Sequence, residues 1–131
     1  MSPQHARAVT DARRILIVDD DGDLREALSE ILRDEGYDVA GAAHGGEALD
    51  RLRGDFHRPA LILLDLTMPV MNGWQFRAEQ RRDPDLSDIP VVVLFAGDHL
   101  PEQMGPLGLQ EYVRKPIELD HLLAAIGRHC S

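Results

Sequence analysis

Short apolar runs alternate along the chain with longer segments in which apolar residues recur at helical spacing. Runs of this length, bounded by turn residues, are typical of strands buried on both faces of a parallel sheet. The three strongest runs cover residues 15–18, 60–64 and 91–95, and two weaker candidates cover residues 37–42 and 112–114. The pattern therefore predicts five strands.

The segments between these runs have the apolar period of amphipathic helices. After the first run, Asp23 and Glu26 have the spacing of a capping box, and apolar residues then follow a helical stripe. The other expected helices lie within residues 47–53, 73–82, 98–109 and 119–126. The third of these is expected to be short, because Gly105 and Pro106 interrupt it.

Five alternations of strand and helix predict a parallel sheet covered by helices on both faces, with right-handed crossovers. We expect an α/β domain of the flavodoxin-like (βα)5 type, a three-layer sandwich with strand order 2-1-3-4-5. Residues 14–131 are expected to form this single domain. The polar, aperiodic residues 1–13 are expected to form a flexible N-terminal arm.

Composition narrows the classes of function. The 131 residues include 23 acidic residues against 14 Lys+Arg, a net charge of -9, which argues against nucleic-acid binding and against binding to anionic membranes. The single cysteine, Cys130, excludes an intrachain disulfide framework. No apolar run approaches the roughly 20 residues needed to cross a bilayer, so we expect a cytoplasmic protein.

Acidic residues follow two of the predicted strands. Asp65 ends the run 60–64, and Asp19, Asp20 and Asp21 follow the first run. In the expected strand order these two strands are neighbours, so the carboxylates converge where open α/β sheets bind ligands. Crowded carboxylates repel one another, and Mg²⁺ is the oxygen-seeking cation that such a site suits. Taken alone, Asp65 has plainer interpretations as a helix cap or a buried polar residue, and Asp21 is equally well explained as a solvated loop residue.

A basic residue follows the last predicted strand. Lys115, followed by Pro116, lies directly after residues 112–114. At the same end of the sheet, its ammonium group would neutralise the carboxylates or hold a phosphoryl oxygen as a point charge.

Three sequence motifs of the chain resemble those of a known family. They are ILIVDDD at residues 15–21, LILLDLTMPVMNG at residues 61–73 and YVRKP at residues 112–116. In this order and spacing the chain resembles the receiver domain of two-component response regulators, and in particular the single-domain chemotaxis regulators. The resemblance covers residues 14–129, nearly the whole chain.

The resemblance implies a role for each matching position. Asp65 would be the phosphoacceptor, taking a phosphoryl group from a phosphohistidine on a histidine kinase or histidine phosphotransferase. Mg²⁺ would be held by Asp19, Asp20, Asp65 and the backbone carbonyl of Thr67. Such a protein assists its own aspartyl phosphorylation and dephosphorylation, and it is not an enzyme acting on free substrates.

The remaining implied roles belong to the motif after the fifth strand. Lys115 would contact the phosphoryl group, and Pro116 would follow it and support the loop, with a cis peptide before Pro116 as one option. The chemistry is reasonable for these residues, since phosphoryl transfer to a carboxylate needs in-line approach and positive charge on the phosphoryl oxygens.

The chain departs from the family pattern at one position. The family has Ser or Thr at the end of the fourth strand, where this chain has Phe95. In the family that hydroxyl bonds the phosphoryl group, and an aromatic residue on the fifth strand, here Tyr112, rotates inward. A hydrogen bond to a charged group contributes roughly 1.5–3 kcal/mol, and Phe95 cannot donate one. The hypothesis is an atypical switch; the alternative is that local repacking accommodates Phe95.

Two functions of other classes remain open. Haloacid-dehalogenase-like phosphatases also use an Asp at a strand end, but they need a second Asp two residues later, where this chain has Thr67. A receiver fold used only for docking, independent of phosphorylation, is favoured by Phe95 and opposed by the retained acidic residues and Lys115.

The expected partners follow from the resemblance. No output domain is recognised in these residues, so we expect a stand-alone receiver that signals through contacts with an unidentified downstream protein. A receiver excised from a longer hybrid protein is the alternative. A homodimer through the face of the fourth helix and fifth strand is a further expectation.

Overall fold

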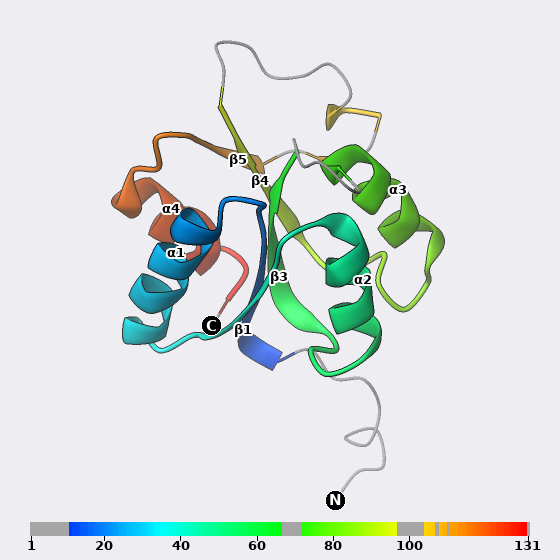
Figure 1. Ribbon diagram of the computed structural model, residues 1–131, viewed down its shortest axis with the longest axis horizontal. Coiled ribbons are helices and arrows are strands. Elements are labelled where there is room, and N and C mark those ends of the chain that lie inside the picture. The colour runs from blue at the N-terminus through cyan, green and yellow to red at the C-terminus, as the bar shows by residue number, and fades with distance from the viewer. Residues whose placement is uncertain (1–10, 67–71, 97–103, 107, 110, 131) are drawn as a thin grey trace, which may run out of the picture.

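Five parallel strands form one sheet in a computed structural model of the chain (Figure 1). The structure describes residues 11–66, 72–96, 104–106, 108–109 and 111–130. The strands are β1 (Asp11–Val18), β2 (Asp38–Ala42), β3 (Pro59–Asp65), β4 (Val91–Phe95) and β5 (Glu111–Arg114). Their order is β2-β1-β3-β4-β5, which confirms the predicted flavodoxin-like arrangement.

Helices cover both faces of the sheet. The described helices are α1 (Gly22–Asp34), α2 (Gly45–Arg53), α3 (Gly73–Arg82) and α4 (Leu119–Gly127). α1 and α4 lie on one face, and α2 and α3 lie on the other (Figure 1). The C-terminal helix α4 is the fifth helix of the sequence prediction, because most of residues 98–109 lie outside the described residues.

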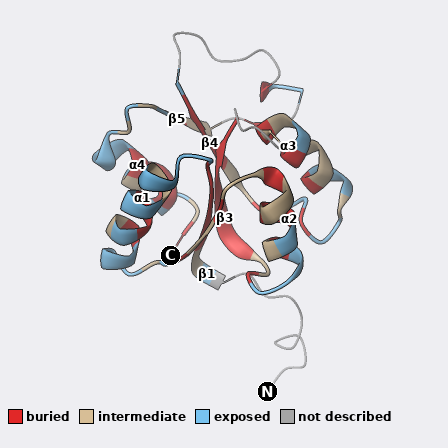
Figure 2. Cartoon of the chain, viewed as in Figure 1, coloured by how far each residue is buried: buried red, intermediate tan, exposed pale blue. Residues whose placement is uncertain are grey.

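Alternate residues of each central strand supply two separate cores. Ile15 and Ile17 of β1 pack with the apolar side chains of α1 and α4, whereas Leu16 and Val18 pack with those of α2 and α3. All seven residues of β3 are buried, as expected of a strand covered on both faces. The central strands of the sheet are mostly buried, and the outward faces of the helices are largely exposed (Figure 2).

The first strand begins earlier than the apolar pattern predicts. β1 includes residues 11–13, which were expected in the flexible arm. Arg13 donates to the backbone carbonyls of Glu35 (3.0 Å) and Gly36 (3.1 Å) at the turn after α1. Backbone pairing and this contact, rather than apolar burial, hold the polar start of the strand. Residues 1–10 lie outside the described residues.

The start of α1 also differs from the prediction. Asp21 is the N-cap, and its carboxylate accepts a hydrogen bond from the Leu24 N–H at 3.1 Å. The predicted capping box of Asp23 and Glu26 is therefore wrong, because the N-cap lies two residues earlier, at Asp21, and Asp23 lies in the first turn of the helix. α3 does begin with a capping box, formed by Asn72 and Gln75.

A fully buried amide fixes the approach to β4. The Gln80 side chain donates to the carbonyls of Leu86 (2.9 Å) and Ile89 (3.0 Å), and its own carbonyl accepts from Arg77 at 2.8 Å. Both donors and the acceptor of the amide are thus satisfied, as burial of a polar group requires. The Gln80 side chain thus ties two points of the loop before β4 to α3.

In the part of the chain that the structure describes, no helix combines the length and apolar character needed to cross a membrane.

Candidate functional site

Three carboxylates converge at the carboxyl end of the sheet. β1 and β3 are neighbours, with Val18 beside Leu64, so the residues that follow, Asp19 and Asp65, come together. One carboxylate oxygen from each of Asp19, Asp20 and Asp65 lies within 4.8 Å of the others. Asp19 is fully buried and Asp65 is 6% exposed, whereas Asp20 is exposed to solvent.

Both the backbone and the carboxylate of the buried Asp19 have hydrogen-bond partners. Its backbone N–H donates to the Ala42 carbonyl of β2 at 3.0 Å. Its carboxylate accepts from the Asp21 N–H at 2.9 Å and from Lys115 Nζ at 2.9 Å. A buried carboxylate needs such partners, and they fix its orientation beside Asp65.

Lys115 reaches the carboxylates from the end of β5. Its Nζ lies 2.9 Å from Asp19 Oδ2 and 3.8 Å from Asp65 Oδ2. Its backbone N–H donates to the Phe95 carbonyl at 2.8 Å, and the Lys115-Pro116 peptide is cis, as the resemblance suggested. Lys115 is the only lysine of the chain, since every other residue among the 14 Lys+Arg is an arginine.

Close packing against the start of α3 also shapes the site. The Gly73 N–H donates to the Leu66 carbonyl at 3.0 Å. A Cβ atom at Gly73 would lie 2.5 Å from Leu66 Cα and 2.6 Å from the Asp65 carbonyl oxygen. Only glycine permits this approach, so α3 begins directly against the Asp65 backbone. The Asn72-Gly73 pair indicated a turn in the sequence, but not this contact.

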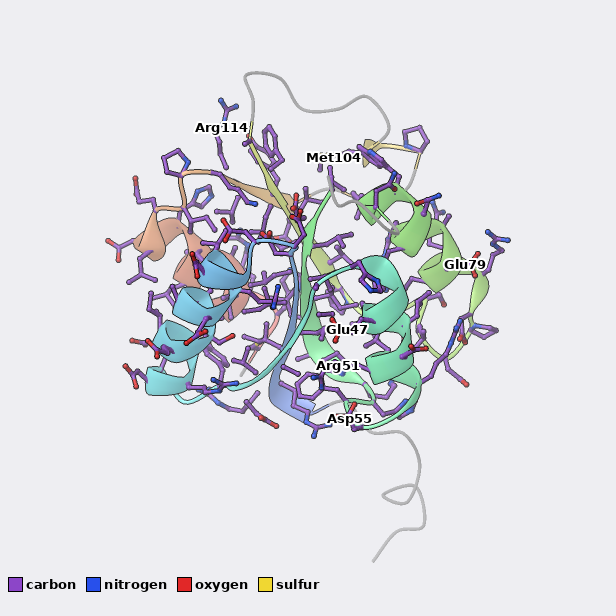
Figure 3. All side chains as sticks on the ribbon, viewed as in Figure 1. Glu47, Arg51, Asp55, Glu79, Met104 and Arg114 are labelled. Atoms are coloured by element: carbon purple, nitrogen blue, oxygen red, sulfur yellow. The ribbon has the colours of Figure 1, made fainter. Side chains whose placement is uncertain are left out.

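Phe95 and Tyr112 lie together at the ends of β4 and β5. Phe95 is 5% exposed, and its ring meets the Tyr112 ring edge-on, with centroids 5.4 Å apart and an interplanar angle of 63°. The guanidinium carbon of Arg114, a residue labelled in Figure 3, lies 5.3 Å from the centre of the Phe95 ring. Thr67, the other predicted site residue, lies outside the described residues.

Sequence reasoning missed one polar contact at the site. Arg25 Nη1 donates to the backbone carbonyl of Asp19 at 2.6 Å. An arginine on the first helix gives no sequence signal for this bond, because its partner is a main-chain atom that any residue supplies.

The chemistry of the donors fits a hard divalent cation. Asp19, Asp20 and Asp65 offer carboxylate oxygens, the ligands that Mg²⁺ prefers, and the exposed Asp20 leaves the site open to water. A carboxylate such as that of Asp65 is chemically able to act as a nucleophile, and Lys115 Nζ lies 3.8 Å from it. The fold and the site together define a flavodoxin-like α/β domain with a cluster of three carboxylates beside a lysine.

Comparisons with known proteins agree with this class. The response regulator receiver domain family matches residues 15–127. The response regulator MprA of Mycolicibacterium vanbaalenii is 41% identical over 113 residues, which cover 85% of this chain and 47% of the relative. The chain therefore spans about half the length of the curated relatives it matches.

Solved structures show the same likeness. The chemotaxis protein CheY4 of Vibrio cholerae superposes with a TM-score of 0.81 at 30% identity, covering 91% of this chain and 99% of that one. The signal receiver domain of a histidine kinase from Syntrophus aciditrophicus gives a TM-score of 0.77 at 32% identity, covering 89% of each chain. The chain belongs to the response regulator receiver domain family of two-component systems, whose members are typically phosphorylated and bind Mg²⁺.

Proposed function

We propose that Asp65 accepts a phosphoryl group from a phosphohistidine of a histidine kinase or histidine phosphotransferase. The observation that carries this proposal is the ion pair between the buried Asp19 and the partly exposed Lys115, which lies beside the Asp65 carboxylate. Asp19, Asp20 and Asp65, with the Thr67 backbone carbonyl, are the proposed ligands of Mg²⁺.

In the proposed reaction, an Asp65 carboxylate oxygen attacks phosphorus in line with the histidine nitrogen. The new O–P bond forms as the N–P bond breaks, and the imidazole leaves with the electron pair of that bond. Asp65 needs no prior deprotonation, because an ionised carboxylate is already a nucleophile. The low exposure of Asp65 limits the water around its own carboxylate, while the site stays open to solvent at Asp20.

The charge of the transferred group is met by this chain's own cation. Lys115 Nζ lies within 3.8 Å of Asp65, and small rotations of its side chain bring the ammonium group to a phosphoryl oxygen. When bound, Mg²⁺ supplies electrostatic stabilisation of the phosphoryl oxygens. Asp19, fully buried and fixed by the Asp21 N–H, orients Lys115 for this task.

We further propose that phosphorylation is transmitted through an atypical switch. Phe95 has no hydroxyl to bond a phosphoryl oxygen, and its ring is in edge-on contact with Tyr112. Inward rotation of Tyr112 has to displace that ring. The Lys115 N–H still bonds the Phe95 carbonyl, so the backbone link between β4 and the phosphoryl-binding lysine is retained.

The phosphoacceptor is tested by intact mass after incubation with acetyl phosphate and Mg²⁺. The wild-type protein is expected to gain one phosphoryl group, and chelation of Mg²⁺ to prevent the gain. Asp65→Asn is expected to remove the adduct, whereas the control Asp21→Asn, which keeps a good helix cap, is expected to retain it. Equal adducts in wild type and Asp65→Asn would show that Asp65 is not the acceptor.

The switch is tested with beryllofluoride, which mimics the phosphoryl group, and Phe95→Thr. Lysine-labelled protein gives one signal, from Lys115, and tyrosine labelling reports Tyr112 beside Tyr37 as an internal control. Beryllofluoride is expected to shift the Lys115 signal in both proteins. The Tyr112 signal is expected to shift more in Phe95→Thr. Equally large Tyr112 shifts would contradict the atypical switch.

One observation favours a second candidate, a docking module that works without phosphorylation. The Phe95 and Tyr112 rings are packed against each other, and this packing would favour a fixed docking surface over a switch. In that case neither acetyl phosphate nor the cognate kinase would modify Asp65 in folded protein. Contacts with a downstream protein, or with a second copy through the edge strand β5 and the fourth helix predicted from the sequence, most of which lies outside the described residues, are proposed for both candidates.

A further inference from the structure

Arg25 of α1 holds the peptide that joins two of the three site carboxylates. Its Nη1 donates to the main-chain carbonyl of Asp19 at 2.6 Å. That carbonyl belongs to the Asp19–Asp20 peptide bond. Asp19 points inward to Lys115, whereas Asp20 is exposed, so the orientation of this one peptide determines whether both carboxylates face Asp65.

The path of the Arg25 side chain depends on a glycine in the neighbouring strand. A Cβ atom at Gly41 of β2 would lie 2.9 Å from Arg25 Cδ and 3.2 Å from its Cγ and Nε. β2 pairs with β1 so that Gly41 lies beside Ile17, two residues before Asp19. The missing side chain of Gly41 therefore leaves the space through which Arg25 reaches the acidic loop.

A second arginine of the same helix serves as a natural comparison. Arg33 Nη2 also donates to a main-chain carbonyl, that of Val39 in β2, at 3.0 Å. The Arg25 bond ties α1 to the residue that follows β1, and the Arg33 bond ties α1 to β2. Arg33, however, is bonded near the start of β2, which begins at Asp38, whereas Arg25 is bonded at the end of β1, next to the carboxylates.

We infer that Arg25 is a positioning residue for the cation site, acting through the Asp19–Asp20 peptide, with Gly41 providing its space. The inference rests on the proposed function, because it concerns the same acidic site. Groups that orient metal ligands typically change metal affinity by about 10- to 100-fold when they are removed.

The sign of the effect separates positioning from simple electrostatics. Arg25 is a cation near a cation site, so removing its charge alone would tighten Mg²⁺ binding. Removing a hydrogen bond that orients two ligands weakens Mg²⁺ binding. A merely structural bond lowers the free energy of unfolding and leaves the Mg²⁺ affinity of the folded protein unchanged.

The experiment is a Mg²⁺ titration of the full chain labelled with [13C]lysine, followed by NMR of the single lysine, Lys115. Fluorescence of Trp74, the only tryptophan, gives a second readout. Arg25→Met is expected to weaken Mg²⁺ binding by about tenfold. Arg33→Met, the matched control, is expected to bind Mg²⁺ as the wild type does, although thermal unfolding shows a loss of stability in both variants.

Gly41→Ala tests the same inference with the charge of Arg25 retained. The new methyl group displaces the Arg25 side chain, so Mg²⁺ binding is expected to weaken in the same direction. Gly127→Ala is its control, because nothing lies within 4 Å of a Cβ atom at that glycine. In the Arg25→Met background, Gly41→Ala is expected to add little, since both changes act on one contact.

Unchanged or tighter Mg²⁺ binding by folded Arg25→Met would overturn the inference, and so would equal weakening by Arg33→Met. Should Arg25→Met not fold, wild-type affinity in Gly41→Ala would overturn it instead. The proposed function is tested separately by the wild-type protein. It fails if the wild type shows no response to Mg²⁺, or if Asp20→Asn, which lacks a proposed ligand, binds Mg²⁺ as well as the wild type does.

Discussion

The two ends of the parallel sheet carry acidic residues in opposite ways. At the amino end, where the strands begin and α2, α3 and α4 finish, acids are paired with arginines. The pairs are Arg14–Asp38 at 3.1 Å, Arg53–Asp83 at 3.3 Å, Arg58–Asp88 at 2.7 Å and Arg128–Glu111 at 3.0 Å. The acidic partners in the first and third pairs are mostly exposed to solvent.

At the carboxyl end, three carboxylates crowd together, and the lysine contacts two of them. Asp19 there is fully buried. Like charges at such distances oppose folding, so this cluster is a poor device for stability and a good one for binding a cation and a phosphoryl group. The comparison distinguishes acids that are paired with arginines from acids that we propose bind a ligand.

The largest expected effect concerns removal of one cation from each end. In the absence of Mg²⁺, Lys115→Met is expected to lower the free energy of unfolding by about 3 kcal/mol, because buried Asp19 loses its partner. Arg53→Met, at the amino end, should cost less than about 1 kcal/mol, since its pair is partly exposed. Urea unfolding followed by Trp74 fluorescence measures both, and equal losses would break the comparison.

Mg²⁺ is expected to stabilise the folded protein by binding at the carboxyl end of the sheet and not at the amino end. At a concentration one hundred times its dissociation constant, a bound ion stabilises the folded state by about 2.7 kcal/mol. Wild type and Asp83→Asn should both show this gain in thermal unfolding, and Asp65→Asn should show much less. A full gain in Asp65→Asn would place the cation elsewhere.

Neutralisation of a single acid is expected to have opposite signs at the two ends. Without Mg²⁺, Asp20→Asn should raise the free energy of unfolding by less than about 1 kcal/mol, because it relieves repulsion among the carboxylates. Asp83→Asn should lower it by a similar amount, through loss of the Arg53 pair. Chemical denaturation in chelator and low salt measures both, and a loss of stability in Asp20→Asn contradicts the prediction.

The smallest expected effect is a pH dependence at the amino end. The hydrogen bond from Arg58 holds the pKa of Asp88 below its ordinary value of 3.8. A lowered folded-state pKa contributes stability above the ordinary value, and this contribution is lost as the pH falls through the folded-state pKa. Asp88 is 63% exposed, so solvent screening limits the contribution to less than about 1 kcal/mol.

Comparison of wild type with Asp88→Asn isolates the contribution of the ionised Asp88 carboxylate to the free energy of unfolding. The difference in free energy of unfolding should be present at about pH 6 and shrink at about pH 3, where the carboxylate begins to be protonated. A difference that grows on acidification would show that Arg58 does not stabilise the ionised form.

The strands and the convergence of the carboxylates could be predicted because they depend on local pattern and topology. A strand buried on both faces must be apolar throughout, so the runs before Asp19 and Asp65 are visible in the sequence. Once β1 and β3 are neighbours, parallel strands bring the residues after their ends together. The position of Lys115 near these carboxylates could be predicted in the same way, because Lys115 comes directly after β5 and so lies at the same end of the sheet.

Other features depend on contacts that no local pattern encodes. Several acids precede α1, and only the observed geometry selects Asp21 over Asp23 as the cap. The bond from Arg25 to the Asp19 carbonyl joins a helix to a main-chain atom across the space left by Gly41. Phe95 was visible as a departure from the family pattern, whereas its packing on Tyr112 required the neighbouring strand.

The buried amide of Gln80 determines how this part of the molecule opens. Residues 83–90 form no regular strand or helix, yet the carbonyls of Leu86 and Ile89 both accept hydrogen bonds from that one side chain on α3. Local detachment of the segment would break both bonds at once and leave a fully buried amide unsatisfied. The segment therefore belongs to the same cooperative unit as α3 and β4, and the hydrogen exchange of its bonded amides follows the opening of that unit.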